Sequence, residues 1–155
     1  MPSSWLNVPH LQQELEYSCI PACLRMVLAH YGDVRTEAEL RQLLDTLPTG
    51  TRAGNIIRLS GPALEVQLRP SNLVEAQTVL SNNQPPIVFL KTGSLEYWNM
   101  DIFHVAVLVG VDALTVALDD PYFPTAPQTT SVPGFEKAWA HTGQFTAYLR
   151  PRQTP

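Results

Sequence analysis

One segment near the amino terminus constrains the fold more than any other. The run PACLRMVLAHY, residues 21–31, has the composition of a helix and carries a single charged side chain, Arg25. A helix with so few polar positions has no solvated face of ordinary width, so most of its circumference must be buried. Gly32 follows directly and is typical of a helix stop. We therefore expect a central helix that the rest of the chain surrounds.

Further helices are expected around it. Thr36 and Glu39 have the spacing of a capping box, which predicts a helix start. A weaker helix is predicted at residues 52–64, interrupted by Gly61-Pro62, and another helix at 73–80, while residues 65–69 alternate as a strand does. The helix at 73–80 has two candidate caps, Ser71 and Asn72. The helix after Thr36 should turn one apolar face to the core, made of four leucines: Leu40, Leu43, Leu44 and Leu47.

The second half of the sequence has β character. Pro133 predicts a last helix that runs through Trp139. No repeat or linker divides the chain, so we expect one α+β domain over residues 1–155, with a helical N-terminal half packed on an antiparallel sheet from the C-terminal half. The predicted strands of that half are short, β-branched or aromatic segments bounded by turn residues: 86–91, 103–109, 115–118 and 144–149.

Composition excludes several classes of protein. Of the 155 residues 45% are apolar, the formal net charge is -4, and the 14 prolines are scattered, which argues against a disordered or low-complexity chain. Two cysteines are too few for a disulfide scaffold, and no basic stripe indicates nucleic-acid binding. The sequence shows no secretory signal and no apolar stretch of the roughly 18 residues that a membrane span needs. We therefore expect a cytoplasmic protein with reduced thiols, without a nucleic-acid partner or membrane insertion.

Cys19 is the first candidate for a chemical role. It lies just before Pro21, at the expected start of the central helix, where unpaired backbone N–H groups and the helix dipole stabilise a thiolate. A free cysteine is also often a small buried apolar residue, so its position alone leaves both interpretations open. Cys23 lies one turn further along and fits the buried interpretation better.

His104 supplies the base that a thiol nucleophile needs. It lies in the run FHVAVLV, and a turn then leads into TVALDD. With a loop at residues 111–113, the hairpin register places His104 directly across from Asp120, and a shift by one residue brings Asp119 or Pro121 there instead. A carboxylate at that position would fix the imidazole tautomer and support its charged form. Alone, His104 also fits a satisfied core histidine; together with Cys19 and a facing Asp it predicts a catalytic triad.

Other residues give weaker signals. No spacing of Cys and His residues provides the four ligands of a zinc site, so no metal site is expected. Tyr97 and Trp98 precede the strand of His104 and fit either a substrate cleft or an ordinary apolar rim. The segment 122–130 either borders the site or connects two strands.

Three blocks of the sequence resemble a known family. They are QELEYSCIPACLRMVLAHYG, HVAVLVGVDALTVALDDP and the ending VPGFEKAWAHTGQFTAYLRP, and together they are similar to the C39 peptidase-like group. This group consists of papain-like cysteine peptidases and includes the double-glycine leader peptidases of bacteriocin exporters. The resemblance covers roughly residues 8–151. It implies a papain-like cysteine peptidase fold, a peptide or protein substrate, and a mechanism that needs no metal or organic cofactor.

The resemblance also implies roles for four residues. Cys19 matches the nucleophile, His104 the general base and Asp120 the acid that orients it, while Gln13, six residues before the nucleophile, matches the oxyanion donor. Ile20 departs from the pattern, because leader peptidases usually have glycine directly after the nucleophile. The sequence also has none of the transporter domains fused to many relatives, so we do not expect the substrate to be inherited from the exporters.

The expected activity is hydrolysis of a peptide bond after small, glycine-like residues, as the narrow clefts of relatives imply. A second hypothesis is a non-catalytic peptide-binding module of the same fold; the intact Gln13, Cys19, His104 and Asp120 argue against it. A third is acyl transfer to a nucleophile other than water, which would use the same residues. The sequence does not separate hydrolysis from acyl transfer.

Overall fold

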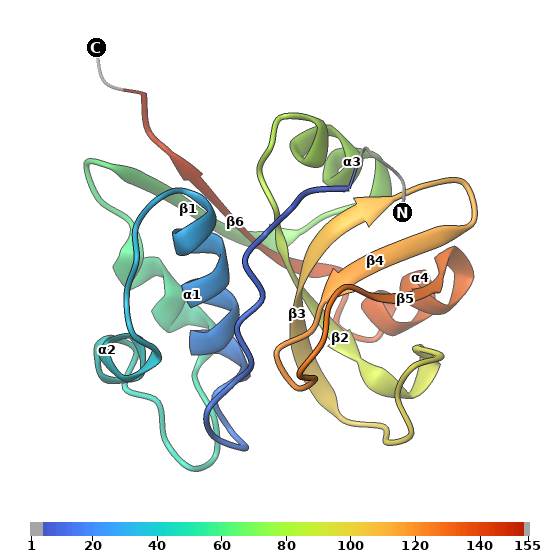
Figure 1. Cartoon of the computed structure of the whole chain (residues 1–155), viewed down its shortest axis with the longest axis horizontal. Helices are drawn as coiled ribbons and strands as arrows, with labels where there is room; N and C mark the ends of the chain where they lie inside the picture. The colour runs from blue at the N-terminus through green and yellow to red at the C-terminus, as the bar shows by residue number, and fades with distance from the viewer. Residues whose placement is uncertain (1–4, 154–155) are drawn as a thin grey trace.

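The buried helix expected near the amino terminus is α1, Cys19–His30. In the computed structural model, which describes residues 5–153, eight residues of α1 are buried and the helix packs on one face of the sheet (Figure 1). Gly32 follows with a φ of 87°, a left-handed conformation that glycine adopts readily, and so ends the helix as expected. The helix begins two residues earlier than its composition indicates, which makes Cys19 its first residue.

Six strands of the described chain form one antiparallel sheet in the order β1-β6-β2-β3-β4-β5. The sequence pattern predicts five of them correctly and misses β5, whose polar segment QTTS pairs with β4 at the sheet edge. The strands are β1 Leu64–Pro70, β2 Ile87–Lys91, β3 Phe103–Val111, β4 Thr115–Asp119, β5 Gln128–Ser131 and β6 Phe145–Pro151.

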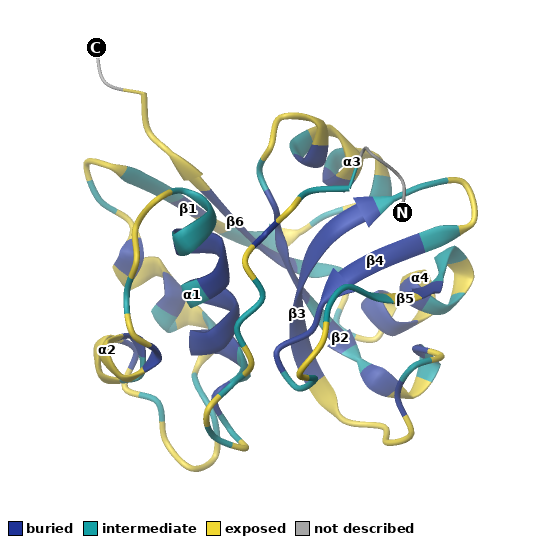
Figure 2. Cartoon of the chain, viewed as in Figure 1, coloured by how far each residue is buried: buried dark blue, intermediate teal, exposed yellow. Residues whose placement is uncertain are grey.

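Helices cover the sheet on both faces, which explains why β3 is buried at every residue from 104 to 110 rather than at alternate residues (Figure 2). Val105 and Val107 pack in the core that contains α1, whereas Ala106 and Leu108 pack in a second core that contains α4. The expected α+β arrangement is confirmed. The other helical elements are α2 Glu37–Leu43, α3 Leu73–Ser81, α4 Val132–Ala140 and the short 3-10 helices η1 Ala53–Leu59 and η2 Thr92–Ser94.

The start of α2 is confirmed and its apolar face is partly wrong. Thr36 accepts a hydrogen bond from the Glu39 N–H, and the Glu39 side chain accepts one from the Thr36 N–H, as a capping box requires. Leu40 and Leu44 are fully buried, but Leu43 is 37% exposed. Leu47 is 58% exposed because it lies beyond the helix, which ends at Leu43.

Two other helical predictions need correction or refinement. The weak helix expected at residues 52–64 is the 3-10 helix η1, which ends before Gly61-Pro62. Asn72 rather than Ser71 caps α3, because its side chain accepts the Glu75 N–H at 2.9 Å.

The expected register of the β3–β4 hairpin is wrong. Val107 pairs with Asp119, whereas the expected register would pair it with Ala117. The turn lies at residues 112–114 instead of 111–113, and next to it Gly110 pairs with Ala117, three positions from the expected partner. An irregularity between Leu108 and Gly110 then reduces this difference to two positions. Asp112 closes this turn by accepting hydrogen bonds from two backbone N–H groups. Its hydrogen bonding and the bulge were not readable from the alternation of apolar residues.

The segment before α1 runs between the α1 side of the molecule and the β3–β4 side (Figure 1). It is tied to the sheet side by two backbone hydrogen bonds, from the Leu6 N–H to Val109 at 2.9 Å and from the Gln13 N–H to Pro121 at 2.8 Å. None of the helices within residues 5–153 is both long and apolar enough to span a membrane.

Candidate active site

The α1 start and the β3 start meet at one pocket of about 270 Å³. Two residues of interest line this pocket. Cys19 is the first residue of α1, and His104 is the second residue of β3. Cys19 is partly exposed, whereas His104 is buried, so Cys19 is the more accessible of the two residues. The remaining lining is largely apolar and includes Ile20, Phe89 and Phe103.

Asp120 lies behind His104 and is fully buried. His104 Nε2 and Asp120 Oδ1 are 2.7 Å apart, a hydrogen-bond distance. The contact expected between these two residues therefore exists although the register is wrong. Continuing the observed register past the end of β4 would put Asp120 across from Ala106, on the same side as His104, so the two side chains meet diagonally.

Asp119, the alternative partner, does not take this place. Burial raises its pKa to about 6, and the nearby His10 acts in the opposite direction. Asp119 and Asp120 are therefore adjacent buried acids with opposite shifts of pKa, and only Asp120 is bonded to His104.

The surroundings of His104 favour its protonated form. Burial disfavours the charged ring, but hydrogen bonding to Asp120 and Cys19, and the charges of both partners, outweigh it and raise the pKa of His104 to about 9. The same contacts act on Asp120: burial opposes ionisation, while the hydrogen bond and charge of His104 hold the pKa of that carboxyl below its ordinary value. The pair is thus arranged to carry an imidazolium next to a carboxylate.

Four donors converge on the Asp120 carboxylate. Besides His104, the Tyr97 hydroxyl donates at 2.7 Å and the Trp98 indole N–H at 2.9 Å to Oδ2, and the Tyr122 N–H donates at 3.0 Å to Oδ1. The sequence predicted that Tyr97 and Trp98 would line either a substrate cleft or an apolar rim. Neither prediction included their hydrogen bonds to Asp120. A run of aromatics gives no sign of it, because the acceptor lies more than twenty residues away in the sequence.

The first turn of α1 is open where the site needs donors. No side chain within the described residues caps it, and the first amides of a helix have no partner inside the helix. Pro21 has no N–H, so the amides of Cys19 and Ile20 are the donors available beside the sulfur. The position of Cys19 at a helix start predicts such unpaired amides near the thiol.

Gln13 lies on the loop that precedes α1 and does not line the pocket. Its side-chain amide donates to the carbonyl oxygen of Leu15 at 2.7 Å and, more weakly, to that of Glu16 at 3.2 Å. Its Oε1 is buried without a hydrogen-bond partner among the described residues. Donation to a substrate would therefore replace one of two existing hydrogen bonds.

The structure also locates Cys23 and the segment 122–130, whose positions the sequence left open. Cys23 is completely buried, and its pKa is raised mainly by burial and further by the charge of Cys19. The segment 122–130 borders the His104 side of the site at its start, where the Tyr122 ring lies 4.7 Å from that of Trp98, and at its end it forms part of β5.

Comparison with known proteins identifies the family. Residues 7–148 match the Peptidase C39 family. A protein from Methanothermobacter thermautotrophicus described as uncharacterized is 34% identical over 111 residues, covering 72% of this chain and 70% of that protein.

Solved structures share the fold. The peptidase domain of Streptococcus ComA, a bifunctional ABC transporter of a quorum-sensing pathway, has a TM-score of 0.75 at 24% identity, over 94% of this chain and all of that one. The double glycine motif protease of an AMS/PCAT transporter, solved in complex with a leader peptide, has a TM-score of 0.74 at 19% identity, over 96% of this chain and 94% of that one. With the match over nearly its whole length, this chain belongs to the peptidase C39 family.

Proposed function

We propose that the protein is a cysteine peptidase in which Cys19 is the nucleophile, His104 the general acid and base, and Asp120 the residue that orients His104. One observation carries this proposal: the partly exposed Cys19 and the buried His104 line the same pocket, and His104 is bonded at 2.7 Å to a buried carboxylate. In cysteine peptidases the thiol needs a neighbouring base and acid of this kind to act as a nucleophile.

The two nitrogens of His104 have different tasks. Because Nε2 is bonded to Asp120, Nδ1 is the nitrogen left to face the thiol. Attack of the Cys19 thiolate on a peptide carbonyl forms a carbon–sulfur bond, and the proton on Nδ1 passes to the leaving amine as the carbon–nitrogen bond breaks. The neutral ring then takes a proton from water, which attacks the thioester and releases the acid and the thiolate.

Negative charge that develops on the carbonyl oxygen needs donors that are already in place. The open amides of Cys19 and Ile20 lie beside the sulfur and supply such donors. Gln13 is the third candidate, and it would reach the oxyanion by giving up its longer bond, the one to Glu16.

The preference for a small residue before the scissile bond is part of the proposal. Ile20 is β-branched, lies directly after the nucleophile and lines the pocket, so it narrows the approach to Cys19. The solved relative with a leader peptide acts at a double glycine motif, and a glycine-like residue is the one that fits such an approach.

The test is a comparison of peptide cleavage by the parent protein and by Cys19→Ala. A peptide library incubated in ¹⁸O-labelled water should yield products from the parent alone, cut after small residues, with label in the new carboxyl group. Products without label, joined to an amine, would indicate acyl transfer instead. Binding without any product from the parent would favour the peptide-binding module and contradict the proposal.

A further inference from the structure

The first turn of α1 is built differently from those of the other α-helices in the described chain. Each of the other N-cap residues has an extended backbone, and its side chain accepts a hydrogen bond from the third residue of the helix; these residues are Thr36, Asn72 and Ser131. Ser18 holds the same position before α1, and serine is among the best N-cap residues. The third residue of α1 is Pro21, which has no N–H, so the Ile20 amide is the one that Ser18 could cap. Yet Ser18 has φ -106° and ψ 29°, and its side chain caps no amide of α1.

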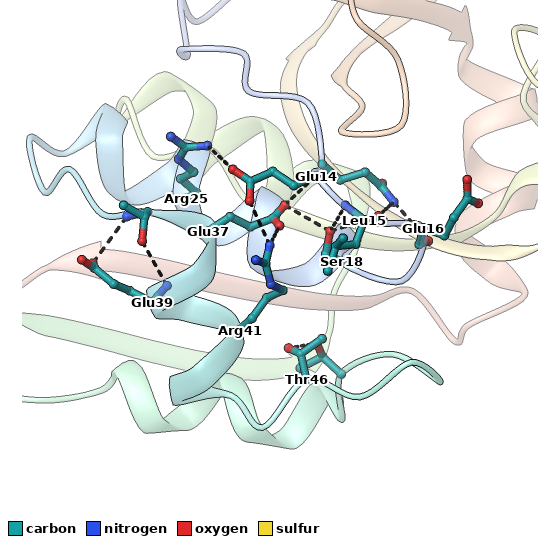
Figure 3. Close-up of polar contacts among 12 residues, drawn as sticks. Glu14, Leu15, Glu16, Ser18, Arg25, Glu37, Glu39, Arg41 and Thr46 are labelled. Atoms are coloured by element: carbon teal, nitrogen blue, oxygen red, sulfur yellow. Dashed lines mark hydrogen bonds and ion pairs between the residues drawn. The ribbon is translucent and has the colours of Figure 1, made fainter.

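The Ser18 hydroxyl is turned away from α1 and toward the preceding loop (Figure 3). It is completely buried, lies 3.0 Å from the Leu15 carbonyl oxygen and 3.1 Å from Glu37 Oε1, and accepts the Leu15 N–H at 3.0 Å. Its single proton has two acceptors on the side away from the helix. The hydroxyl is thus held where it cannot cap α1.

Glu37, from the first turn of α2, is itself firmly fixed. It is 1% exposed, and its Oε1 also accepts the Glu14 N–H at 3.0 Å. Its Oε2 pairs with Arg41, which binds the Glu14 carboxylate at 3.0 Å as well. A buried carboxylate with several donors is costly to displace or to leave unpaired. Glu37 therefore fixes the loop that connects Gln13 to Cys19.

We propose that Glu37 is a positioning residue for the reaction at Cys19: it holds Ser18 in a conformation that does not cap α1, so that the amides of Cys19 and Ile20 stay open for the oxyanion. This inference rests on the proposed peptidase function and adds a residue to it. Pro21 sharpens the consequence. Because it occupies the third helical position and has no N–H, the Ile20 amide is the group that a released Ser18 hydroxyl would engage.

Loss of Glu37 should act on catalysis in a specific way. A released Ser18 would accept the Ile20 N–H and remove one oxyanion donor, and loss of one such donor lowers kcat by about 10²-fold to 10³-fold. The donor acts on the transition state, so KM should change little. A role in stability alone would instead affect folding without this division between kcat and KM.

The kinetic test uses the effect of a second substitution. Glu37→Ala should lower kcat on a cleaved peptide by about 10²-fold. Adding Ser18→Ala removes the competing hydroxyl and should raise kcat at least about tenfold above that of Glu37→Ala. Glu39→Ala is the matched control, because Glu39 belongs to the same helix turn and caps α2 without touching the loop before Cys19. A double variant no better than Glu37→Ala overturns the proposal.

Amide hydrogen exchange tests the inference without any turnover, which separates its failure from failure of the proposed function. Exchange of the Ile20 amide should slow in Glu37→Ala and speed up again when Ser18→Ala is added. The parent protein gives a second test that holds even where Glu37→Ala does not fold. There the capped amides of Glu39, Glu75 and Gly134 should exchange about tenfold or more slowly than that of Ile20. An Ile20 amide as protected as these three would overturn the proposal.

Discussion

The two sides of the candidate site differ in how completely their polar groups are hydrogen-bonded. On the sheet side, Asp120 receives hydrogen bonds from His104 and from three further donors, so this carboxylate is saturated. On the helix side, the amides of Cys19 and Ile20 are left without a cap. The difference indicates two separate roles. The sheet side fixes His104 in one orientation, and the helix side leaves backbone amides free to bind negative charge that develops only during the reaction.

The largest effect should come from the sulfur on the helix side. Cys19→Ala removes the nucleophile and should abolish peptide cleavage, measured as product formed per hour by mass spectrometry. Cys23→Ala is the matched control, because it removes a thiol one turn further along that is completely buried. It should lower the free energy of unfolding but leave cleavage by the folded protein intact. Loss of cleavage in Cys23→Ala with activity kept in Cys19→Ala would reverse the assignment.

The next largest effect should come from the saturated carboxylate. Asp120→Asn should lower kcat by about 10³-fold to 10⁴-fold, because the amide no longer supports the charged ring or its tautomer. In the parent, activity should fall on the alkaline side near pH 9, where His104 loses its proton. In Asp120→Asn that fall should move to lower pH, since the interaction that raises the pKa is gone.

The pH dependence of stability is a second measurement of the His104–Asp120 interaction. The raised pKa of His104 contributes stability that is complete below its ordinary value of about 6.5 and is lost as the pH rises through about 9. The difference in Tm between the parent and Asp120→Asn should therefore be larger at pH 6 than at pH 10. An equal difference at both values would contradict the assigned pair.

A smaller effect is expected at the loop before α1. Gln13→Ala should lower kcat by about 10²-fold if its amide joins the open donors in binding the oxyanion. Gln12→Ala is the matched control, because the neighbouring Gln12 side chain donates to the Tyr122 carbonyl and faces solvent. Equal kinetics for the two variants would remove Gln13 from the site and leave the backbone amides as the donors.

The smallest effect tests how much the saturation of Asp120 matters. Tyr97→Phe deletes one of four donors and should lower kcat by about threefold to tenfold, with the alkaline limb of the pH profile displaced by a fraction of a pH unit. Tyr31→Phe deletes a hydroxyl that donates to Leu149 at 2.7 Å, and it should affect stability alone. A profile unchanged by Tyr97→Phe would show that the remaining donors suffice.

Local chemistry made much of the fold readable from the sequence. The single charge of α1, the capping box at Thr36 and the Gly32 stop are decided by neighbouring residues, and the structure agrees with each. The polar edge strand β5 and the exposed Leu47 were misjudged because both depend on what packs beside them.

In the candidate site, too, contacts within one hairpin could be predicted from the sequence and contacts between distant segments could not. The partnership of His104 and Asp120 could be predicted because both residues lie on one hairpin, even with a register wrong by two positions. The contacts of Tyr97 with Asp120 and of Glu37 with Ser18 could not, because they join segments whose approach is set by the tertiary fold. A sequence pattern records periodicity within an element and carries no comparable signal for such contacts.

The most direct test of the account is the rate at which iodoacetamide labels each cysteine at pH 6, located by mass mapping. An ordinary thiol is almost entirely protonated at that pH, so a thiolate held by His104 should react at least about tenfold faster than a free-cysteine peptide. We expect fast labelling at Cys19, none at Cys23 in the folded protein, and a return to the rate of the peptide in His104→Ala. Labelling of Cys19 no faster than the peptide, unchanged by His104→Ala, would contradict the proposed triad.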